Sequence, residues 1–137
     1  MYVARLAWEN ATRSVVHERL FGHGQKVIHE YRALGDATAW VEWRQDAAWL
    51  RHIQTSAPRT GQAGLLLDLL KGICARHAVP IHGKVVPPLV MGQGERRLPE
   101  LVDWYLDHGF SVINGQPPQL CFPPLEAWSA GRFRRAV

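Results

Sequence analysis

Three consecutive segments rich in β-branched and aromatic residues constrain the fold of this chain more than any other feature. They are KVIHEYRAL (26–34), TAWVEWRQ (38–45) and AAWLRHIQT (47–55). Only the short polar joints GDA and QDA separate them. Because joints this short connect only antiparallel neighbours, the segments predict a three-stranded antiparallel meander.

A leucine-rich helix is predicted directly after the meander. Its apolar residues recur at helical spacing and form one wide face: Leu65, Leu66, Leu67, Leu69, Leu70, Ile73 and Cys74. The pattern fades near ARHAVP, where Pro80 ends the helix. PIHGKVV (80–86) then indicates a strand. Because a helix separates it from the strand at 47–55, the two strands should run parallel.

The last third of the chain predicts one more helix and a final pair of strands. A loop punctuated by proline and glycine spans 87–97. Pro99 suits the first turn of the helix LPELVDWYLDH, and Gly109 ends that helix. FSVING (110–115) and QLCFP (119–123) then predict two strands joined across QPP.

The N-terminal region allows two interpretations. YVARLAW (2–8) predicts a first strand, and a short helix within 9–25 would begin at Asn10 and end at Gly22 and Gly24. In the alternative, SVVHERLF is a strand that leads into a hairpin at GHG. We favour the helix.

The order of these elements predicts an α+β fold with a mixed sheet and flanking helices. The chain is expected to form a single domain over 1–137. That domain would have a short helical region at the N-terminus and a basic tail at about 126–137, where Arg132, Arg134 and Arg135 lie.

Composition and charge narrow the classes of function. No apolar run approaches the roughly 20 residues that cross a bilayer, so we expect no membrane association. The two cysteines, Cys74 and Cys121, form no disulfide framework, which favours reduced thiols and a cytoplasmic location. The net charge of +4 weakly favours anionic partners such as phosphates or nucleic acid.

The stretch PRTGQAG (58–64) places small residues where the leucine-rich helix begins. Gly61, Ala63 and Gly64 remove bulk beside helix amides that have no partner within the helix, and Arg59 adds a positive charge. A phosphate can bind such amides directly, although a tight strand–helix turn would also explain the glycines. The sequence lacks G-x-x-x-x-G-K-[ST], which excludes a P-loop, and it lacks the dinucleotide-binding glycine pattern.

The segment IQTSAPRTGQAGLLLDLL resembles the acyl-CoA-binding motif of the GNAT superfamily, the acetyl-CoA-dependent N-acetyltransferases. Gly61 and Ala63 match its two small positions, and Leu66 and Leu67 match its leucine pair. The family's basic or glutamine position falls on Pro58, so the arginine is displaced by one residue to Arg59.

The segment LVDWYLDHGFSV (101–112) resembles a second GNAT motif, in which a tyrosine precedes a Gly-Phe pair. Tyr105, Gly109 and Phe110 occupy these places. The upstream asparagine and alanine that are common in the family are not present here. The resemblance covers roughly residues 38–122.

The resemblance implies that the chain transfers an acetyl group from acetyl-CoA to an amine by direct attack in a ternary complex. Coenzyme A would bind between two splayed parallel strands, here 48–55 and 80–86. The residues expected to contact it are Ile53, Gln54, Thr55, Arg59, Thr60, Gly61, Gln62, Ala63 and Gly64. Tyr105 is the expected general acid, with His52 or Glu42 as the base. We expect no metal.

Two other functions stay open. The chain could be a non-catalytic, CoA-binding regulatory module, or a nucleic-acid-directed modifier or binder that uses the +4 charge and the arginine tail. Only residues 9–25 are available for the two helices that commonly shape the acceptor site in the family. We therefore expect an open acceptor cleft and a macromolecular acceptor. A homodimer is also compatible with the sequence.

Overall fold

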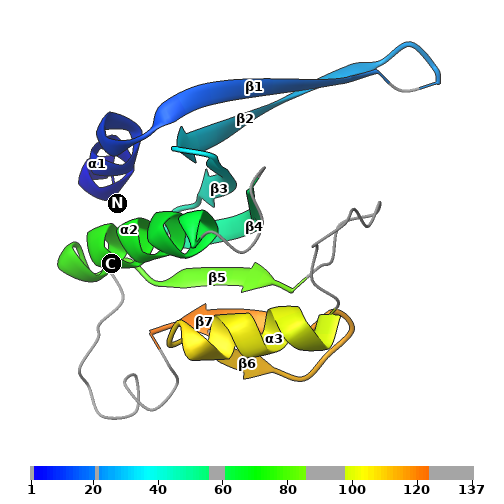
Figure 1. Ribbon diagram of the computed structural model, residues 1–137. Coiled ribbons are helices and arrows are strands. Elements are labelled where there is room, and N and C mark those ends of the chain that lie inside the picture. The colour runs from blue at the N-terminus through cyan, green and yellow to red at the C-terminus, as the bar shows by residue number, and fades with distance from the viewer. Residues whose placement is uncertain (1, 21, 56–60, 86–97, 124–137) are drawn as a thin grey trace.

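The structure is a computed structural model in which residues 2–20, 22–55, 61–85 and 98–123 are described (Figure 1). Its elements in chain order are α1 (Tyr2–Ala11), β1 (Arg13–Leu20), β2 (Lys26–Leu34), β3 (Ala37–Trp43), β4 (Ala48–Thr55), α2 (Gln62–Arg76), β5 (Ile81–Lys84), α3 (Leu98–Asp107), β6 (Ser111–Ile113) and β7 (Gln119–Phe122). The strands form one mixed sheet in the order β1-β2-β3-β4-β5-β7-β6. The predicted α+β class is confirmed.

The first element corrects one prediction, because residues 2–8 lie in a helix and not in a strand. Ala4 and Trp8 are buried, whereas Tyr2 is 75% exposed. A spacing of four residues between buried side chains is one helical turn, and a strand would bury every second residue. The Thr12 hydroxyl donates to the Trp8 carbonyl at 2.6 Å and closes the end of α1.

The predicted helix within 9–25 is also wrong, and the alternative interpretation is confirmed. β1 pairs with β2 along its whole length in an antiparallel hairpin, and Gly24 adopts φ +83° in the turn. Val16 is 58% exposed and Ile28 is 59% exposed, because this hairpin extends past the body of the sheet (Figure 1). The strand conformation of this segment therefore depends on backbone hydrogen bonds between β1 and β2, and not on burial of an apolar stripe.

β2, β3 and β4 form the predicted antiparallel meander. One face of it carries Ala37, Ala39 and Ala48, which are fully buried. Such small side chains let α2 lie close, and α2 contacts all three strands. On the same face of β2, the Arg32 guanidinium donates to the Glu9 carbonyl of α1 at 2.6 Å. α1 and α2 therefore cover the same side of the sheet.

The predicted leucine-rich helix and the parallel strand after it are confirmed as α2 and β5. The buried residues of α2 are Leu66, Leu67, Leu70, Ile73 and Cys74. Beyond its last turn, Ala78 has φ +55°, and the Val79 amide donates to the Cys74 carbonyl at 2.8 Å. This turn directs the chain into β5.

The predicted third helix and final strand pair are confirmed as α3, β6 and β7. β7 pairs with β5 on one side and β6 on the other, so the pair extends the same sheet. His108 follows α3 and lies against Gly64 near the start of α2. Tyr105 of α3 shares a buried cluster with the apolar residues of α2.

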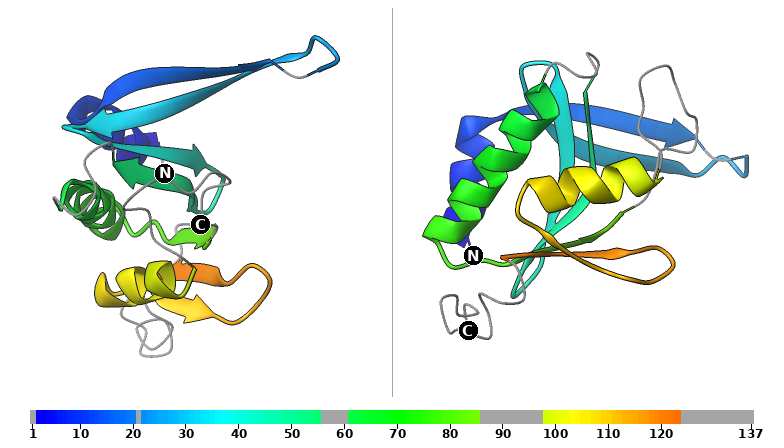
Figure 2. Two further views of the ribbon diagram at one scale, coloured as in Figure 1. Left: turned by 45° about the vertical axis from the view of Figure 1, so that its right-hand side comes forward. Right: turned by 60° about the horizontal axis from the view of Figure 1, so that its bottom comes forward.

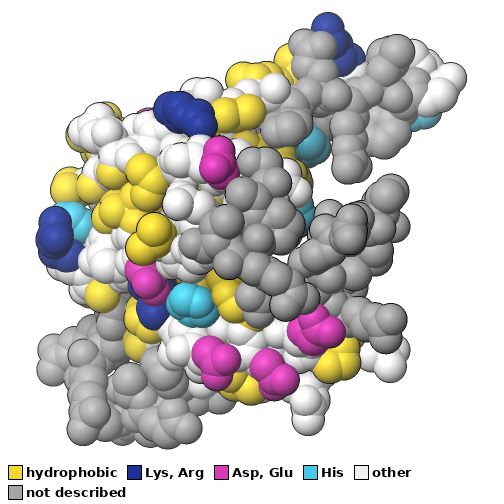
Figure 3. Space-filling model, in the orientation of Figure 1, with side chains coloured by type: hydrophobic (Ala, Val, Ile, Leu, Met, Phe, Trp, Pro, Cys, Tyr) yellow, Lys and Arg dark blue, Asp and Glu magenta, His cyan; other side chains and the backbone are white. Residues whose placement is uncertain are grey.

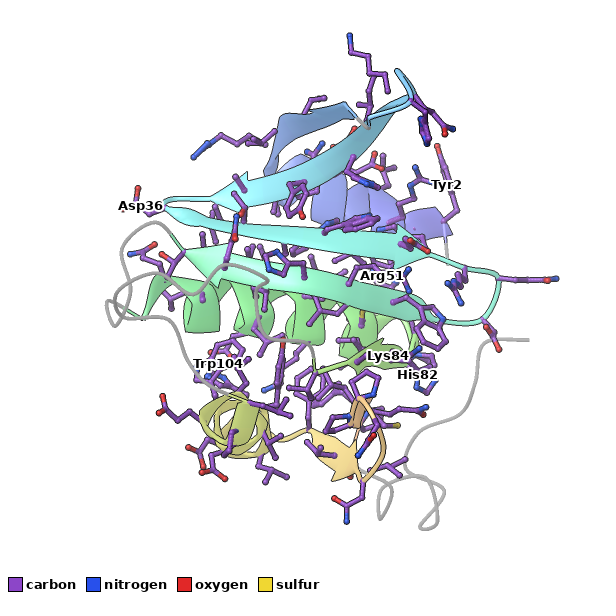
Figure 4. All side chains as sticks on the ribbon, turned by 90° about the vertical axis from the view of Figure 1, so that its right-hand side faces the viewer. Tyr2, Asp36, Arg51, His82, Lys84 and Trp104 are labelled. Atoms are coloured by element: carbon purple, nitrogen blue, oxygen red, sulfur yellow. The ribbon has the colours of Figure 1, made fainter. Side chains whose placement is uncertain are left out.

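The described helices thus gather on one side of the sheet (Figure 2). We call this side the helix face, and the opposite side the outer face; Figure 4 views the outer face, with α2 behind the strands. Within the described residues, no helix has the length and apolar character needed to span a membrane.

Candidate functional site

The centre of the sheet contains a fork between β4 and β5. The two strands pair only at Ala48↔Ile81, Trp49↔His82 and Leu50↔Gly83. Beyond these pairs β4 continues to Thr55, whereas β5 ends at Lys84 and pairs with β7. The predicted splayed pair of parallel strands is therefore present.

Gly83 lies at the base of this fork, where the two backbones come very close. A Cβ atom at Gly83 would lie 2.5 Å from the Leu50 carbonyl oxygen. No side chain fits there unless the strands separate. Glycine within a strand often marks such a close approach of two backbones.

A β-bulge opens the fork on the β4 side. The register passes from Trp40↔His52 to Val41↔Leu50, which leaves Arg51 as the extra residue of β4. A bulge bends its strand and increases its twist. Because Arg51 directly follows the last residue of β4 that pairs with β5, the bend begins where the two strands part.

The bulge also changes which β4 residues face the helices. Before it, Ala48 and Leu50 are buried on the helix face; after it, Ile53 packs against the same core. Gln54 is exposed, and Thr55 is half-buried. Backbone groups of a strand alternate in direction, so part of the backbone over 51–55 points toward the side from which β5 has diverged.

The start of α2 presents backbone amides. Gly61 is its N-cap, with φ +81° and no side-chain cap, and the first helical hydrogen bond runs from the Leu65 amide to the Gly61 carbonyl at 3.0 Å. The amides of Gln62, Ala63 and Gly64 precede that bond and have no partner within the helix. Among the described residues, a Cβ atom at Gly61 would meet no atom within 4 Å, so none of them covers this side of the helix start.

The two glycines of the motif have different environments. A Cβ atom at Gly64 would lie 3.0 Å from the Cε1 atom of His108, so Gly64 makes room for that ring. The Nδ1 atom of His108 lies 3.4 Å from an Asp68 carboxylate oxygen, and its ring lies 4.7 Å from that of Trp104. Gly64 thus joins α2 to the end of α3, whereas Gly61 leaves the backbone accessible.

Arg59 and Thr60, two of the residues predicted to contact the cofactor, lie outside the described residues.

Tyr105 lies on the helix face and is buried. Its ring centroid is 5.6 Å from that of Phe110, in an edge-to-face arrangement. Burial raises the pKa of its phenol above the ordinary value, because desolvation disfavours the phenolate. Tyr105 therefore remains protonated near neutral pH, which is the state that a proton donor requires.

The two candidate bases lie on the other side of the sheet. His52 pairs with Trp40 on the outer face, with its ring 6.1 Å from that of Tyr31. The Glu42 carboxylate forms ion pairs with Arg51 at 3.2 Å and Arg44 at 3.3 Å. The structure therefore separates the predicted acid from the predicted bases by the thickness of the sheet.

Sequence reasoning missed three residues that shape this region. Gly83 had a local signal, since a glycine within a strand pattern indicates a bulge or a close backbone approach. Arg51 had none, because a bulge is a property of the register between two strands. His108 reaches Gly64 across 44 positions of sequence, and no local pattern marks that contact.

Within the described residues, no cluster of His, Cys, Asp and Glu side chains could hold a metal ion.

Comparison with known proteins supports the fold alone. No protein-family model matches the sequence, and no curated protein does so either. Among solved structures, the chain is similar to the crystal structure of the anti-CRISPR protein AcrVA5, with a TM-score of 0.53 and 15% sequence identity. The match covers 64% of this chain and 92% of that protein. Together with the sheet order and the β4–β5 fork, it indicates a GNAT-like fold.

Proposed function

We propose that this chain is an acetyl-CoA-dependent N-acetyltransferase that transfers an acetyl group to an amine by direct attack. The observation that carries the proposal is the fork between β4 and β5, which lies within a GNAT-like fold on the strand that leads to an open helix N-terminus. An extended thioester with a charged diphosphate needs these two features next to each other.

In this proposal, the diphosphate binds the amides at the start of α2. Gly61 leaves room for it, and the helix dipole favours its negative charge. Arg59 and Thr60 would add contacts from the segment just before the helix. The pantetheine arm would lie along Ile53, Gln54 and Thr55, where a backbone amide can polarise the thioester carbonyl. One such donor is worth about 3 kcal/mol in the transition state.

The separation of acid and base across the sheet suits a reaction in the fork, because a group between the two strands is accessible from both faces. Tyr105 would protonate the leaving thiolate from the helix face. His52, or Glu42 through a water molecule, would accept the amine proton from the outer face. In this step the amine nitrogen bonds to the acetyl carbon, the carbon–sulfur bond breaks, and coenzyme A leaves as a thiol.

Isothermal calorimetry with acetyl-CoA, coenzyme A and ATP tests the cofactor class. We expect the first two to bind and ATP to bind at least tenfold more weakly, because ATP has no pantetheine arm to fill the fork. Equal binding of all three would indicate a general nucleotide site and would contradict the proposal. Turnover is then measured as the release of free coenzyme A thiol with protein amines as acceptors.

The similarity to AcrVA5, an anti-CRISPR protein, favours a second and narrower candidate, which is action against a CRISPR system. The two functions are compatible if the acceptor amine belongs to a CRISPR component. The test is target cleavage by purified CRISPR nucleases after incubation with this chain, with and without acetyl-CoA. Unchanged cleavage across the nuclease types would remove this candidate and leave the acetyltransferase proposal intact.

A further inference from the structure

The outer face of the sheet is basic and aromatic, in contrast to the apolar helix face. Strand register places His29 and Tyr31 of β2, Trp40 and Glu42 of β3, Trp49 and His52 of β4, and His82 and Lys84 of β5 on it. Arg51, the bulge residue of β4, reaches it through its ion pair with Glu42. Arg44 joins this group through its ion pair with Glu42. Figure 4 shows Arg51, His82 and Lys84 on this face.

The rings of the outer face form a continuous cluster across neighbouring strands. Trp40 lies 4.1 Å from His29 and 6.0 Å from Tyr31, measured between ring centroids, and Tyr31 lies 6.1 Å from His52. A second pair, Trp49 and His82, is 5.5 Å apart. All these side chains are half-buried, so each keeps part of its surface accessible.

Cationic groups accompany the rings. The Arg44 guanidinium carbon lies 4.4 Å from the centroid of the Trp49 ring, and that of Arg51 lies 5.7 Å from the centroid of the Trp40 ring. Lys84 is exposed next to the fork. Among the described strand residues, Glu42 is the acidic side chain on this face, and both arginines already pair with it.

One helix on the other side of the sheet, α3, has the opposite charge. α3 presents the exposed acidic residues Glu100, Asp103 and Asp107, and Figure 3 shows Asp and Glu side chains gathered over that helix. A polyanion would therefore be repelled from α3 and attracted to the outer face.

We propose that the outer face binds single-stranded nucleic acid. Phosphates would contact Arg44, Arg51 and Lys84, and exposed bases would stack on the Trp40–Tyr31 and Trp49–His82 ring pairs. The half-buried rings leave part of their surface open for stacking. Unpaired bases can stack on such rings, as in sheet-based recognition of single strands.

This chemistry selects one ligand class. An acidic peptide offers the charge but no planar bases, and a duplex offers phosphates but hides its bases. The proposal does not depend on acetyl transfer, since it needs neither the fork nor a cofactor.

Fluorescence anisotropy with a labelled 20-nucleotide single-stranded oligonucleotide tests the proposal. The probes for comparison are the same sequence as a duplex and polyglutamate of similar length. We expect the single strand to bind at least tenfold more tightly than either probe at low salt. Equal binding of all three probes would show that the outer face attracts any polyanion through charge alone, and it would overturn the proposal.

A matched pair of variants locates the site. Arg51→Gln with Lys84→Gln removes two cations and the Glu42–Arg51 ion pair from the outer face. Arg5→Gln with Arg76→Gln removes two cations and the Arg5–Glu9 ion pair from α1 and α2. We expect only the first variant to lose at least tenfold in affinity. The slope of log K against log salt should also fall by about 1.4, since each lost contact to a single strand counts about 0.7.

Two results would overturn this location of the site: an equal loss in both variants, or no loss in the first variant. Circular dichroism and urea unfolding of each variant show whether it remains folded. If the first variant is unfolded, Trp40→Leu is measured instead, because it removes the stacking ring and keeps every charge. The same loss of affinity for the single strand is expected from it, and unchanged affinity would overturn the proposal.

Discussion

The two faces of the central sheet carry different kinds of side chains. On the helix face, β3 and β4 carry three buried alanines beside larger residues such as Leu50. Much of the remaining bulk comes from α1 and α2, including the buried Trp8. On the outer face the same strands carry Trp40, Trp49 and charged groups. The difference teaches that one strand can serve two purposes, because alternate residues face different environments. The helix face stabilises the fold, and the outer face is the one that we propose for recognition.

The first prediction tests this division with two tryptophans. Trp8→Ala should lower the free energy of unfolding by about 4 kcal/mol, because Trp8 is 1% exposed and its removal leaves a large cavity. Trp49→Ala should lower it by only about 1 kcal/mol, because Trp49 is half-buried on the outer face. Urea unfolding followed by circular dichroism measures both values. Equal losses would break the comparison between the faces.

The second prediction concerns the boundary between the faces, at the base of the fork. Gly83→Ala should lower the free energy of unfolding by about 3 kcal/mol, since its Cβ atom would meet the Leu50 carbonyl. Gly72→Ala is the matched control. It lies in α2, an added Cβ there would meet no atom of the described residues within 4 Å, and the substitution should stabilise the protein by up to about 1 kcal/mol. A tolerated Gly83→Ala would show that the fork is not closed at its base.

The third prediction addresses the residue on the helix face to which we assign a chemical role. Tyr105→Phe should reduce acetyl transfer about 100-fold with a small change in stability, because it removes the proton donor and keeps the buried ring. Tyr2→Phe removes a hydroxyl from an exposed tyrosine and should leave turnover unchanged. Turnover is measured by release of coenzyme A thiol. If the Tyr105 variant binds acetyl-CoA and turns over at the normal rate, the acid is another group.

The fourth prediction concerns how the stability of the fold depends on pH through two groups buried on the helix face. Burial raises the pKa of the Cys74 thiol to about 12, and it raises the pKa of Tyr105 as well. As the pH rises above about 9, these groups lose protons in the unfolded chain before they do so in the folded protein. Stability should therefore fall, by at most about 1.4 kcal/mol per pH unit for each group. Urea unfolding between pH 8 and 11 measures this fall.

Replacement of the thiol provides the control for that experiment. Cys74→Ala should lower stability near neutral pH, because it leaves a cavity, but should show a shallower decline above pH 9, because one of the two titrating groups is gone. A stability that stays constant or increases over this range would contradict the burial of both groups.

Much of the fold could be predicted from local pattern. The meander, α2, β5 and α3 follow from short joints, a leucine stripe and proline or glycine boundaries. The N-terminal 25 residues could not be assigned, because YVARLAW contains residues typical of strands and its helical signal rests on the spacing of Ala4 and Trp8 alone. Once α1 occupies that region, only a strand hairpin remains for the following residues.

The candidate site was less accessible to sequence reasoning. The splayed strands could be predicted only through the resemblance to the GNAT superfamily, because β4 and β5 lie on either side of α2 in the chain. The small residues at the start of α2 could be predicted directly, since PRTGQAG is one short stretch of sequence. The bulge at Arg51 depends on how β3 pairs with β4. The contact between Gly64 and His108 depends on where α3 packs. Both are tertiary properties, and they appear only when distant segments are placed together.

The short pairing of β4 with β5 has a mechanical consequence. Three residue pairs join the plate formed by β1 to β4 to the plate formed by β5, β7 and β6. So short a pairing resists rotation less than a longer one would, so the packing of α2 against α3 also has to hold the two parts in place. If the proposed acetyl transfer holds, the length of acyl chain that fits would depend on the stiffness of this short pairing, and not only on the volume of a rigid pocket.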